Sequence, residues 1–354
     1  MASRKKQDGA PPASTEDRVL TPAAVDEDER FDRLFRPESL DEFIGQDKHK
    51  QNLQVFVAAA RKRTEPLDHI LLCGPPGLGK TTLAYILAKE MGVNLALTSG
   101  PAVEHKGALT GVLTKLGRGD VLFIDEIHRL NATVEEALYP AIEDFRMDVM
   151  MGEGAYAESI SIDLRPFTLV GATTRTGLLT KPLQERFGVT LRLDFYPVSD
   201  LERIVSRSAR LFGVPCTDGG ARALAQRSRG TPRVANRLLR RARDFAEVEG
   251  NGQIDDQIVR LTCDRLEIDE AGLDEMDRRL LSILIDHYEG GPVGVETLAA
   301  AMAEPRDTIE DVYEPYLLQQ GFLGRTPRGR VATKKSYEHL GKPLVDRAPQ
   351  GKLF

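Results

Sequence analysis

The sequence is poor in cysteine, has no tryptophan and contains no apolar run as long as a membrane-spanning helix. Its three cysteines, Cys73, Cys216 and Cys263, lie far apart, and no two of them form a C-x-x-C pair. This spacing favours neither a zinc site nor a disulfide framework, and it is typical of a reducing compartment. The N-terminus also lacks the apolar core of a signal peptide. We therefore expect a cytoplasmic protein with no membrane partner.

An overall excess of basic residues is missing as well. The chain has 48 Lys and Arg against 54 Asp and Glu, which gives a net charge of −6 at pH 7. The net charge gives no indication of nucleic-acid binding, although a local basic patch can still contact nucleic acid. The length of 354 residues predicts two or three domains, and 41% hydrophobic content is ordinary for a globular protein.

A glycine-rich segment between a predicted strand and a predicted helix carries the clearest motif. Residues 74–81 read Gly-Pro-Pro-Gly-Leu-Gly-Lys-Thr, the G-x-x-x-x-G-K-T pattern of a phosphate-binding loop. Residues 70–73 before it are apolar, and apolar residues recur at helical spacing after it. Glycines turn backbone N–H groups towards phosphate, Lys80 can reach the β- and γ-phosphates, and the Thr81 hydroxyl can hold Mg²⁺. The segment predicts binding of a nucleoside triphosphate.

A second motif places two acids at the end of a predicted strand. Residues 121–124 are apolar and are followed by Asp125 and Glu126. A strand buried on both faces has such a continuous apolar run. Its carboxyl end would bring Asp125 to the Mg²⁺ shell and Glu126 to an attacking water.

The remaining pattern predicts three domains between two tails. Strands alternate with helices up to a last strand at 189–193, which favours a parallel sheet, and the chain is helical after Tyr196. The predicted fold is α/β: a P-loop NTPase domain with a parallel sheet core, a small helical lid domain and a C-terminal winged-helix domain. The expected segments are a disordered tail at 1–30, the large domain at 31–195, the lid at 196–270, the winged helix at 271–340 and a second tail at 341–354. A polar, acidic linker around 267–274 is expected to separate the last two domains.

The last domain combines three predicted helices with a basic strand-turn-strand, which is a winged-helix pattern. Its local basic face consists of Arg306, Arg325, Arg328 and Arg330. We predict DNA contact there, with Arg306, Arg325 and Arg330 as binding residues. The alternative is a structural cap with a solvated charged turn.

An insertion at 145–164 interrupts the large domain with two predicted strands, 146–151 and 159–164. A two-stranded ribbon has little to bury against, so apolar residues on it would form a partner site. The alternative is a hairpin that folds down and stabilises the large domain. The apolar residues are Met147, Val149, Met150, Met151, Ile160 and Ile162.

Together these features resemble the RuvB family of AAA+ ATPases, the motors of Holliday junction branch migration. The motifs that carry the resemblance are the P-loop, residues 125–128, Phe-Ile-Gly-Gln at 43–46, Gly-Ala-Thr-Thr-Arg at 171–175 and Gly-Thr-Pro-Arg at 230–233. The resemblance covers roughly 31–340. It implies ATP and Mg²⁺ as cofactors, translocation of duplex and Holliday junction DNA, and a homohexameric ring. It also implies RuvA as the partner gripped by the 145–164 hairpin, and the resolvase RuvC.

The resemblance also implies roles for single residues. Thr174 is similar to the sensor 1 residue, Arg186 to the arginine finger that acts on a neighbouring subunit's nucleotide, and Arg233 to sensor 2. With Lys80, Asp125 and Glu126 they form the implied catalytic set, and Thr81 and Asp125 form the metal set. The residues implied to contact the nucleotide are Phe35, Arg36, Gly77, Gly79, Lys80, Thr81, Thr82, Glu143, Asp144, Phe145, Arg186, Tyr196 and Arg233.

Two other readings stay open at this point. A clamp-loader-like ATPase would share the core motifs but would end in a helical collar. A DNA-binding regulator would use ATP only as a switch, and it would not need Glu126, Thr174 and Arg186 together.

Overall fold

The structure is a computed structural model that describes residues 35–151 and 158–344. The predicted tail at 1–30, most of the predicted tail at 341–354 and the turn of the insertion lie outside these residues. Residues 35 and 36 belong to the first of the two compact units of the chain, and the Phe35 side chain is buried. Among the described helices, none combines the length and apolarity needed to cross a membrane.

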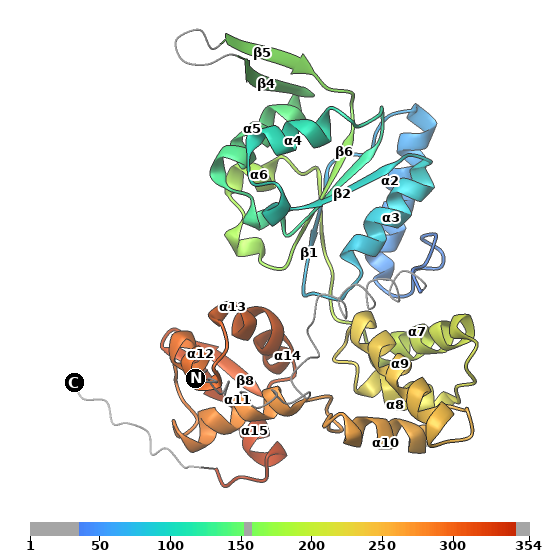
Figure 1. The fold of residues 1–354 in the computed structure, drawn as a ribbon, viewed down its shortest axis with the longest axis vertical. Coiled ribbons are helices and arrows are strands. Elements are labelled where there is room, and N and C mark those ends of the chain that lie inside the picture. The colour runs from blue at the N-terminus through green and yellow to red at the C-terminus, as the bar shows by residue number, and fades with distance from the viewer. Residues whose placement is uncertain (1–34, 152–157, 345–354) are drawn as a thin grey trace, which may run out of the picture. The chain divides into compact units, whose positions relative to one another are not determined.

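The large domain is built on a parallel sheet of five strands in the order β2-β3-β6-β1-β7 (Figure 1). Along β1, Ile70 and Leu72 pack into one core, whereas Leu71 and Cys73 pack into another. Both faces of the sheet are therefore covered, which explains the continuous apolar runs in the sequence. The strands are β1 (Ile70–Cys73), β2 (Leu95–Ser99), β3 (Val121–Asp125), β6 (Thr168–Thr173) and β7 (Val189–Arg192).

Helices cover the two faces of this sheet. Asn131 caps α5, because its side chain accepts a hydrogen bond from the Val134 N–H. The helices are α2 (Asp47–Arg63), α3 (Lys80–Met91), α4 (Lys106–Leu113), α5 (Ala132–Glu143) and α6 (Lys181–Glu185), with short turns η1 (Gly100–Ala102), η2 (Ile127–Arg129) and η4 (Thr176–Leu178).

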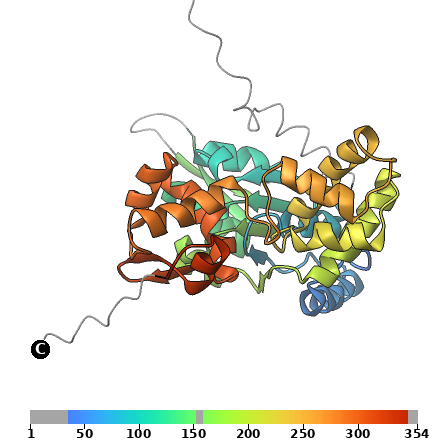
Figure 2. The ribbon, with the colours of Figure 1, turned by 90° about the horizontal axis from the view of Figure 1, so that it is seen from below.

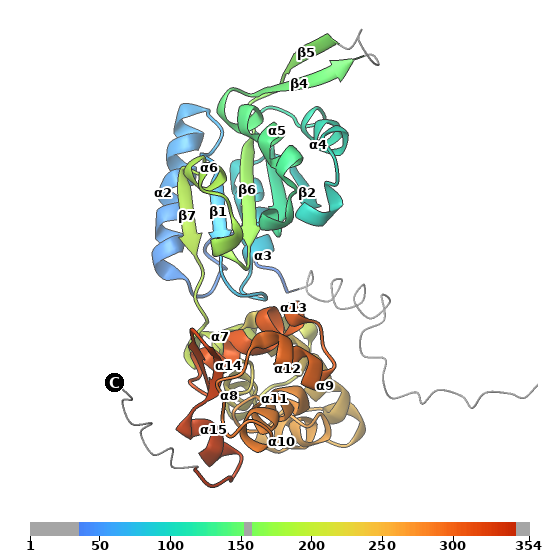
Figure 3. The ribbon, with the colours of Figure 1, turned by 90° about the vertical axis from the view of Figure 1, so that its left-hand side faces the viewer.

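The predicted insertion hairpin forms from β4 (Arg146–Met151) and β5 (Glu158–Asp163), which pair antiparallel and extend beyond the sheet of their domain (Figure 3). Met147 is fully buried against the large domain, while Ile160 is 45% exposed. The hairpin root therefore stabilises the domain, and an apolar residue stays exposed further along it.

The lid consists of α7 (Val198–Phe212), α8 (Asp218–Gln226), α9 (Pro232–Val248) and α10 (Asp256–Arg265), coloured yellow to light orange in Figure 2. Thr231 caps α9 through the Val234 N–H, with Pro232 in the first turn. A proline fits there because the first helical N–H groups have no partner within the helix.

The winged helix has its own core. Its third predicted helix is divided by a π-helical segment, because Pro315 has no N–H to donate to the Asp311 carbonyl. The last helix, α15, was not expected from the sequence. The elements are α11 (Glu275–Asp286), α12 (Val295–Met302), α13 (Arg306–Thr308), η5 (Ile309–Tyr313), α14 (Glu314–Gln319), β8 (Leu323–Thr326), β9 (Gly329–Ala332) and α15 (Lys334–His339).

The acidic segment at 267–274 lies between α10 and α11, and its end is held by contacts with the lid. Arg229 of the lid donates to the Gly272 carbonyl at 2.8 Å and pairs with Asp274 at 2.7 Å and with the fully buried Asp277. Its guanidinium also lies over the Tyr316 ring, 5.6 Å from the centroid. These contacts tie the lid to the winged helix.

Candidate functional site

The P-loop joins β1 to α3 and has the backbone that phosphate binding requires. Gly74 and Gly77 have φ angles of 141° and 80°, in the region that favours glycine. A Cβ on Gly74 would lie 2.6 Å from the Leu193 carbonyl oxygen, and one on Gly77 would lie 3.0 Å from the Arg233 Cβ. The loop is therefore packed closely between the last strand and the lid.

Lys80 extends back over this loop. Its Nζ donates to the carbonyl oxygens of Gly74 at 2.8 Å and Pro75 at 2.9 Å, and only 7% of the residue is exposed. Burial lowers the pKa of Lys80, although Glu126 and Asp125 oppose this shift. The phosphates of a bound nucleotide would compensate the charge of the buried Lys80 ammonium. The loop and Lys80 therefore fit the nucleoside triphosphate that the sequence predicts here.

Asp125, at the end of β3, is a partly buried carboxylate whose negative charge favours a nearby cation. Burial raises the pKa of Asp125, the neighbouring Glu126 carboxylate adds to the shift, and the hydrogen bond from the Glu126 N–H opposes it. Two adjacent carboxylates in a partly buried site favour a cation. With the Thr81 hydroxyl at the start of α3, Asp125 offers the oxygen ligands that Mg²⁺ prefers.

Glu126 is held by the end of the neighbouring strand β6. The Thr174 hydroxyl donates to Glu126 Oε2 at 3.0 Å, and the Thr174 N–H lies 3.4 Å from the same oxygen. His128 Nδ1 lies 3.1 Å from that oxygen and 2.9 Å from the Thr173 hydroxyl. Sequence reasoning gave His128 no role, although its position just after the acidic pair could have suggested one.

The lid reaches the P-loop through the segment that begins α9. The Arg233 N–H is 3.4 Å from the Gly77 carbonyl oxygen, and the positive charge of Arg233 acts on the pKa values of Lys80 and Asp125. Tyr196 is buried, its hydroxyl lies 3.4 Å from the Leu78 carbonyl oxygen, and burial raises its pKa. Lys80, Asp125, Glu126, Thr174 and Arg233 thus belong to one site.

Arg186 belongs to a second cluster. It pairs with Glu143 at 3.1 Å, donates to the Pro182 carbonyl at 2.7 Å and lies over the Tyr139 ring, 4.1 Å from the centroid. Asp144 and Phe145 directly follow Glu143 at the junction of α5 and β4. The implied nucleotide residues therefore divide into a P-loop group and an Arg186 group.

The predicted DNA-binding arginines differ in exposure. The side chains of Arg325 and Arg306 are 61% and 53% exposed, and Arg328 is exposed as well. Arg330, at 7%, pairs with Glu310 at 2.9 Å and with the buried Glu314. The expectation that Arg330 contributes to a basic surface is wrong for this structure, because its charge is neutralised inside the domain.

Family models of known proteins match almost all of the described chain. Residues 35–193 match the model of the Holliday junction DNA helicase RuvB P-loop domain, residues 196–269 the RuvB AAA lid domain, and residues 270–341 the RuvB C-terminal winged helix domain. The chain belongs to the RuvB family.

Individual RuvB proteins support this membership. The chain is 59% identical over 331 residues to a Holliday junction branch migration complex subunit RuvB of Rubrobacter xylanophilus, covering 94% of this chain and 93% of that one. A structure of the Thermotoga maritima RuvB Holliday junction branch migration motor is similar with a TM-score of 0.82 and 53% identity, covering 88% of this chain and 100% of the other. The expected AAA+ P-loop fold with a lid and a winged helix is confirmed, and a clamp-loader-like helical collar is excluded by the winged helix.

Proposed function

We propose that this chain is an ATP-driven motor that translocates duplex DNA and thereby moves Holliday junctions in recombination and repair. The observation that carries the proposal is the joining of a complete hydrolytic set, Lys80, Asp125, Glu126 and Thr174, to a winged helix in a chain of the RuvB family. The family supports ATP and Mg²⁺ as cofactors and DNA as the substrate. We place its action in the cytoplasm.

In the proposed hydrolysis, Lys80 neutralises charge on the β- and γ-phosphates, and Thr81 with Asp125 would hold Mg²⁺. When bound, the metal supplies electrostatic stabilisation of the transferring phosphoryl group. Glu126 polarises the attacking water, for which its carboxylate must turn from Thr174 and His128 to the water. Arg233 reports the γ-phosphate from the lid.

The ATP site is proposed to be shared between subunits of a homohexameric ring. Arg186 pairs with Glu143 in a cluster of its own, and we assign this cluster, with Asp144 and Phe145, to the neighbouring subunit's nucleotide. Phe35, Arg36 and Tyr196 are proposed to hold the base, and Gly77, Gly79 and Thr82 to line the phosphates.

DNA contact is proposed through phosphates at the wing. Arg325→Ala combined with Arg328→Ala should weaken binding of all duplex sequences alike, because phosphate contacts carry no sequence information. The plot of log affinity against log salt concentration should become shallower, and the magnitude of its slope should decrease by about 2. Each lost phosphate contact reduces that magnitude by about 1. Fluorescence anisotropy with two unrelated duplexes at several salt concentrations measures both effects.

The control for this pair is Arg243→Ala, an arginine of the lid. Its salt slope should match that of the unaltered protein. Weakening confined to one duplex sequence would point instead to base readout by the wing arginines.

The hairpin is proposed to bind RuvA, the partner that binds the junction. The resolvase RuvC is proposed to cut the junction later. Ile160→Asp should abolish partner binding and leave DNA-independent ATP hydrolysis and the melting temperature nearly unchanged, because Ile160 is exposed. Val248→Asp, at an 83% exposed apolar position of the lid, is the matched control and should bind the partner normally. Preserved affinity in the folded fraction, with a large drop in melting temperature, contradicts the assignment.

The proposal is tested by steady-state ATP turnover with and without duplex DNA. A motor is expected to hydrolyse ATP faster when duplex is added. A DNA-binding regulator that uses ATP as a switch would bind ATP and DNA with no DNA-stimulated turnover, and that result would overturn the motor assignment.

A further inference from the structure

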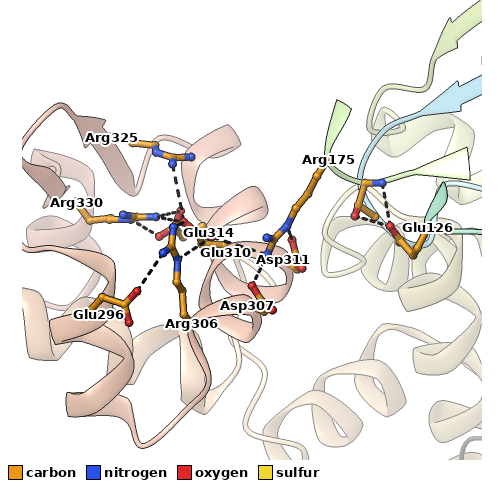
Figure 4. Close-up of polar contacts among 11 residues, drawn as sticks. Glu126, Arg175, Glu296, Arg306, Asp307, Glu310, Asp311, Glu314, Arg325 and Arg330 are labelled. Carbon is orange, nitrogen blue, oxygen red and sulfur yellow. Dashed lines mark hydrogen bonds and ion pairs between the residues drawn. The ribbon is translucent and has the colours of Figure 1, made fainter. Parts of the chain in front are cut away.

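Arg175 connects the hydrolytic site to the winged helix. It directly follows Thr174, the residue that bonds Glu126, and its own N–H bonds the Thr173 hydroxyl at 3.0 Å. Its side chain leaves the large domain and meets acids at the start of the third helical region of the winged helix (Figure 4). Nε lies 2.5 Å from Asp311 and Nη2 lies 3.1 Å from Asp307.

The same acidic face also contacts arginines of the winged helix, among them the exposed Arg306 and Arg325. Glu310, with 13% of its side chain exposed, lies 3.8 Å from Arg175 and 3.9 Å from Arg325. It pairs more closely with Arg306 at 3.3 Å and Arg330 at 2.9 Å. Although burial would raise its pKa, hydrogen bonds from Arg306 and Arg330 lower the pKa of Glu310 overall, so it stays a carboxylate.

We propose that Arg175, Asp307 and Asp311 form a latch that restrains hydrolysis until DNA engages the winged helix. While the latch is closed, the segment after β6 is fixed at both ends, and Thr174 keeps Glu126 bonded instead of free for water. Arg175 is thus a positioning residue that acts through Thr174. The inference rests on the proposed function, and it adds the route by which DNA raises the rate of hydrolysis.

The exposure of the latch makes it releasable. Asp307 and Asp311 are 77% and 37% exposed, and ion pairs in contact with solvent are weak and sensitive to nearby charge. DNA phosphates beside this face are anions that compete with the Asp307 and Asp311 carboxylates for the Arg175 guanidinium, whose side chain is 22% exposed.

The contact between the lid and the winged helix is buried, unlike the exposed latch. Arg229 pairs there with Asp277, whose side chain is fully buried. Because this pair is protected from solvent, the winged helix and the lid keep their contact when the latch opens. Opening of the latch therefore also acts on the P-loop by a second route, through the lid and the contact of Arg233 at the start of α9 with the loop.

A double-mutant cycle tests the latch. Arg175→Gln and Asp311→Asn each remove one side of the contact, and the kcat and KM for ATP are measured with and without saturating duplex, together with the melting temperature. Asp256→Asn is the matched control, because Asp256 forms an exposed pair with Arg260 at 2.7 Å within α10 and is 47% exposed.

Each latch variant should raise kcat without DNA by about 2- to 30-fold, the range for residues that couple two sites. The KM for ATP, the melting temperature and the DNA-stimulated kcat should stay nearly unchanged, so the stimulation ratio falls. The double variant should equal either single variant, because both break one contact. Additive effects, or an Asp311→Asn protein that behaves like Asp256→Asn, would overturn the latch.

The unaltered protein separates this failure from failure of the proposed function. If it shows no DNA-stimulated turnover, the motor assignment is wrong. If it is stimulated by DNA and the latch variants match the control, only the latch is wrong.

Discussion

Glu126→Gln is expected to keep ATP binding and to lose hydrolysis by about 10²–10⁴-fold, the contribution that a general base typically makes. The amide keeps the shape of the side chain but cannot take a proton from water. The Thr174 hydroxyl can still donate to the amide oxygen, so the fold around Glu126 should be preserved. Nucleotide binding by fluorescence and single-turnover hydrolysis measure the two quantities separately.

Lys80→Ala is the companion variant, and its defect should lie in ATP binding. Lys80 is the buried cation of the P-loop, so its removal takes charge from the phosphate site itself. If both variants lost ATP binding to the same degree, the separate roles assigned to Lys80 and Glu126 would be wrong.

Arg186→Ala is expected to lower turnover in a uniform assembly by about 10³–10⁵-fold, the contribution of arginine fingers in comparable enzymes. The side chain belongs to the Glu143 cluster, so its own P-loop site stays complete in the variant. Mixing Arg186→Ala subunits with Lys80→Ala subunits should therefore restore activity. The Arg186→Ala subunit supplies the nucleotide site and its neighbour supplies the finger.

Arg146→Ala controls for the loss of an arginine near this cluster, because Arg146 forms only an exposed pair with Asp163 at 3.4 Å among its described contacts. It should hydrolyse ATP normally. If mixed assemblies of Arg186→Ala and Lys80→Ala form yet stay inactive at every ratio, the finger does not act between subunits.

The sequence was most informative where function depends on a local pattern. The P-loop requires glycines at fixed spacing, a buried strand before it and a helix after it, and all three can be recognised within about ten residues on either side of the loop. The same holds for Asp125 and Glu126 at the end of β3, where the structure brings them to Lys80. The alternation of apolar strands and helices likewise predicted the parallel sheet, and the helical pattern after Tyr196 predicted the lid.

Pairing between distant charges could not be predicted in this way. Arg330 is two residues from a solvent-exposed turn residue, Arg328, and nothing in its neighbourhood indicates that Glu310 and Glu314 neutralise it. Arg175 and Asp311 are 136 residues apart, and their contact depends on how two folded domains meet. The contact between Arg229 and Asp277 could not be predicted from the sequence for the same reason.

Junction movement is the activity that a branch migration motor must show. A four-way junction with homologous arms is incubated with this protein, its junction-binding partner, Mg²⁺ and ATP, and the release of duplex products is followed over time. The account predicts ATP-dependent release that is lost with Glu126→Gln and restored by the unaltered protein. Robust ATP hydrolysis on the bound junction with no release of duplex products would contradict the account.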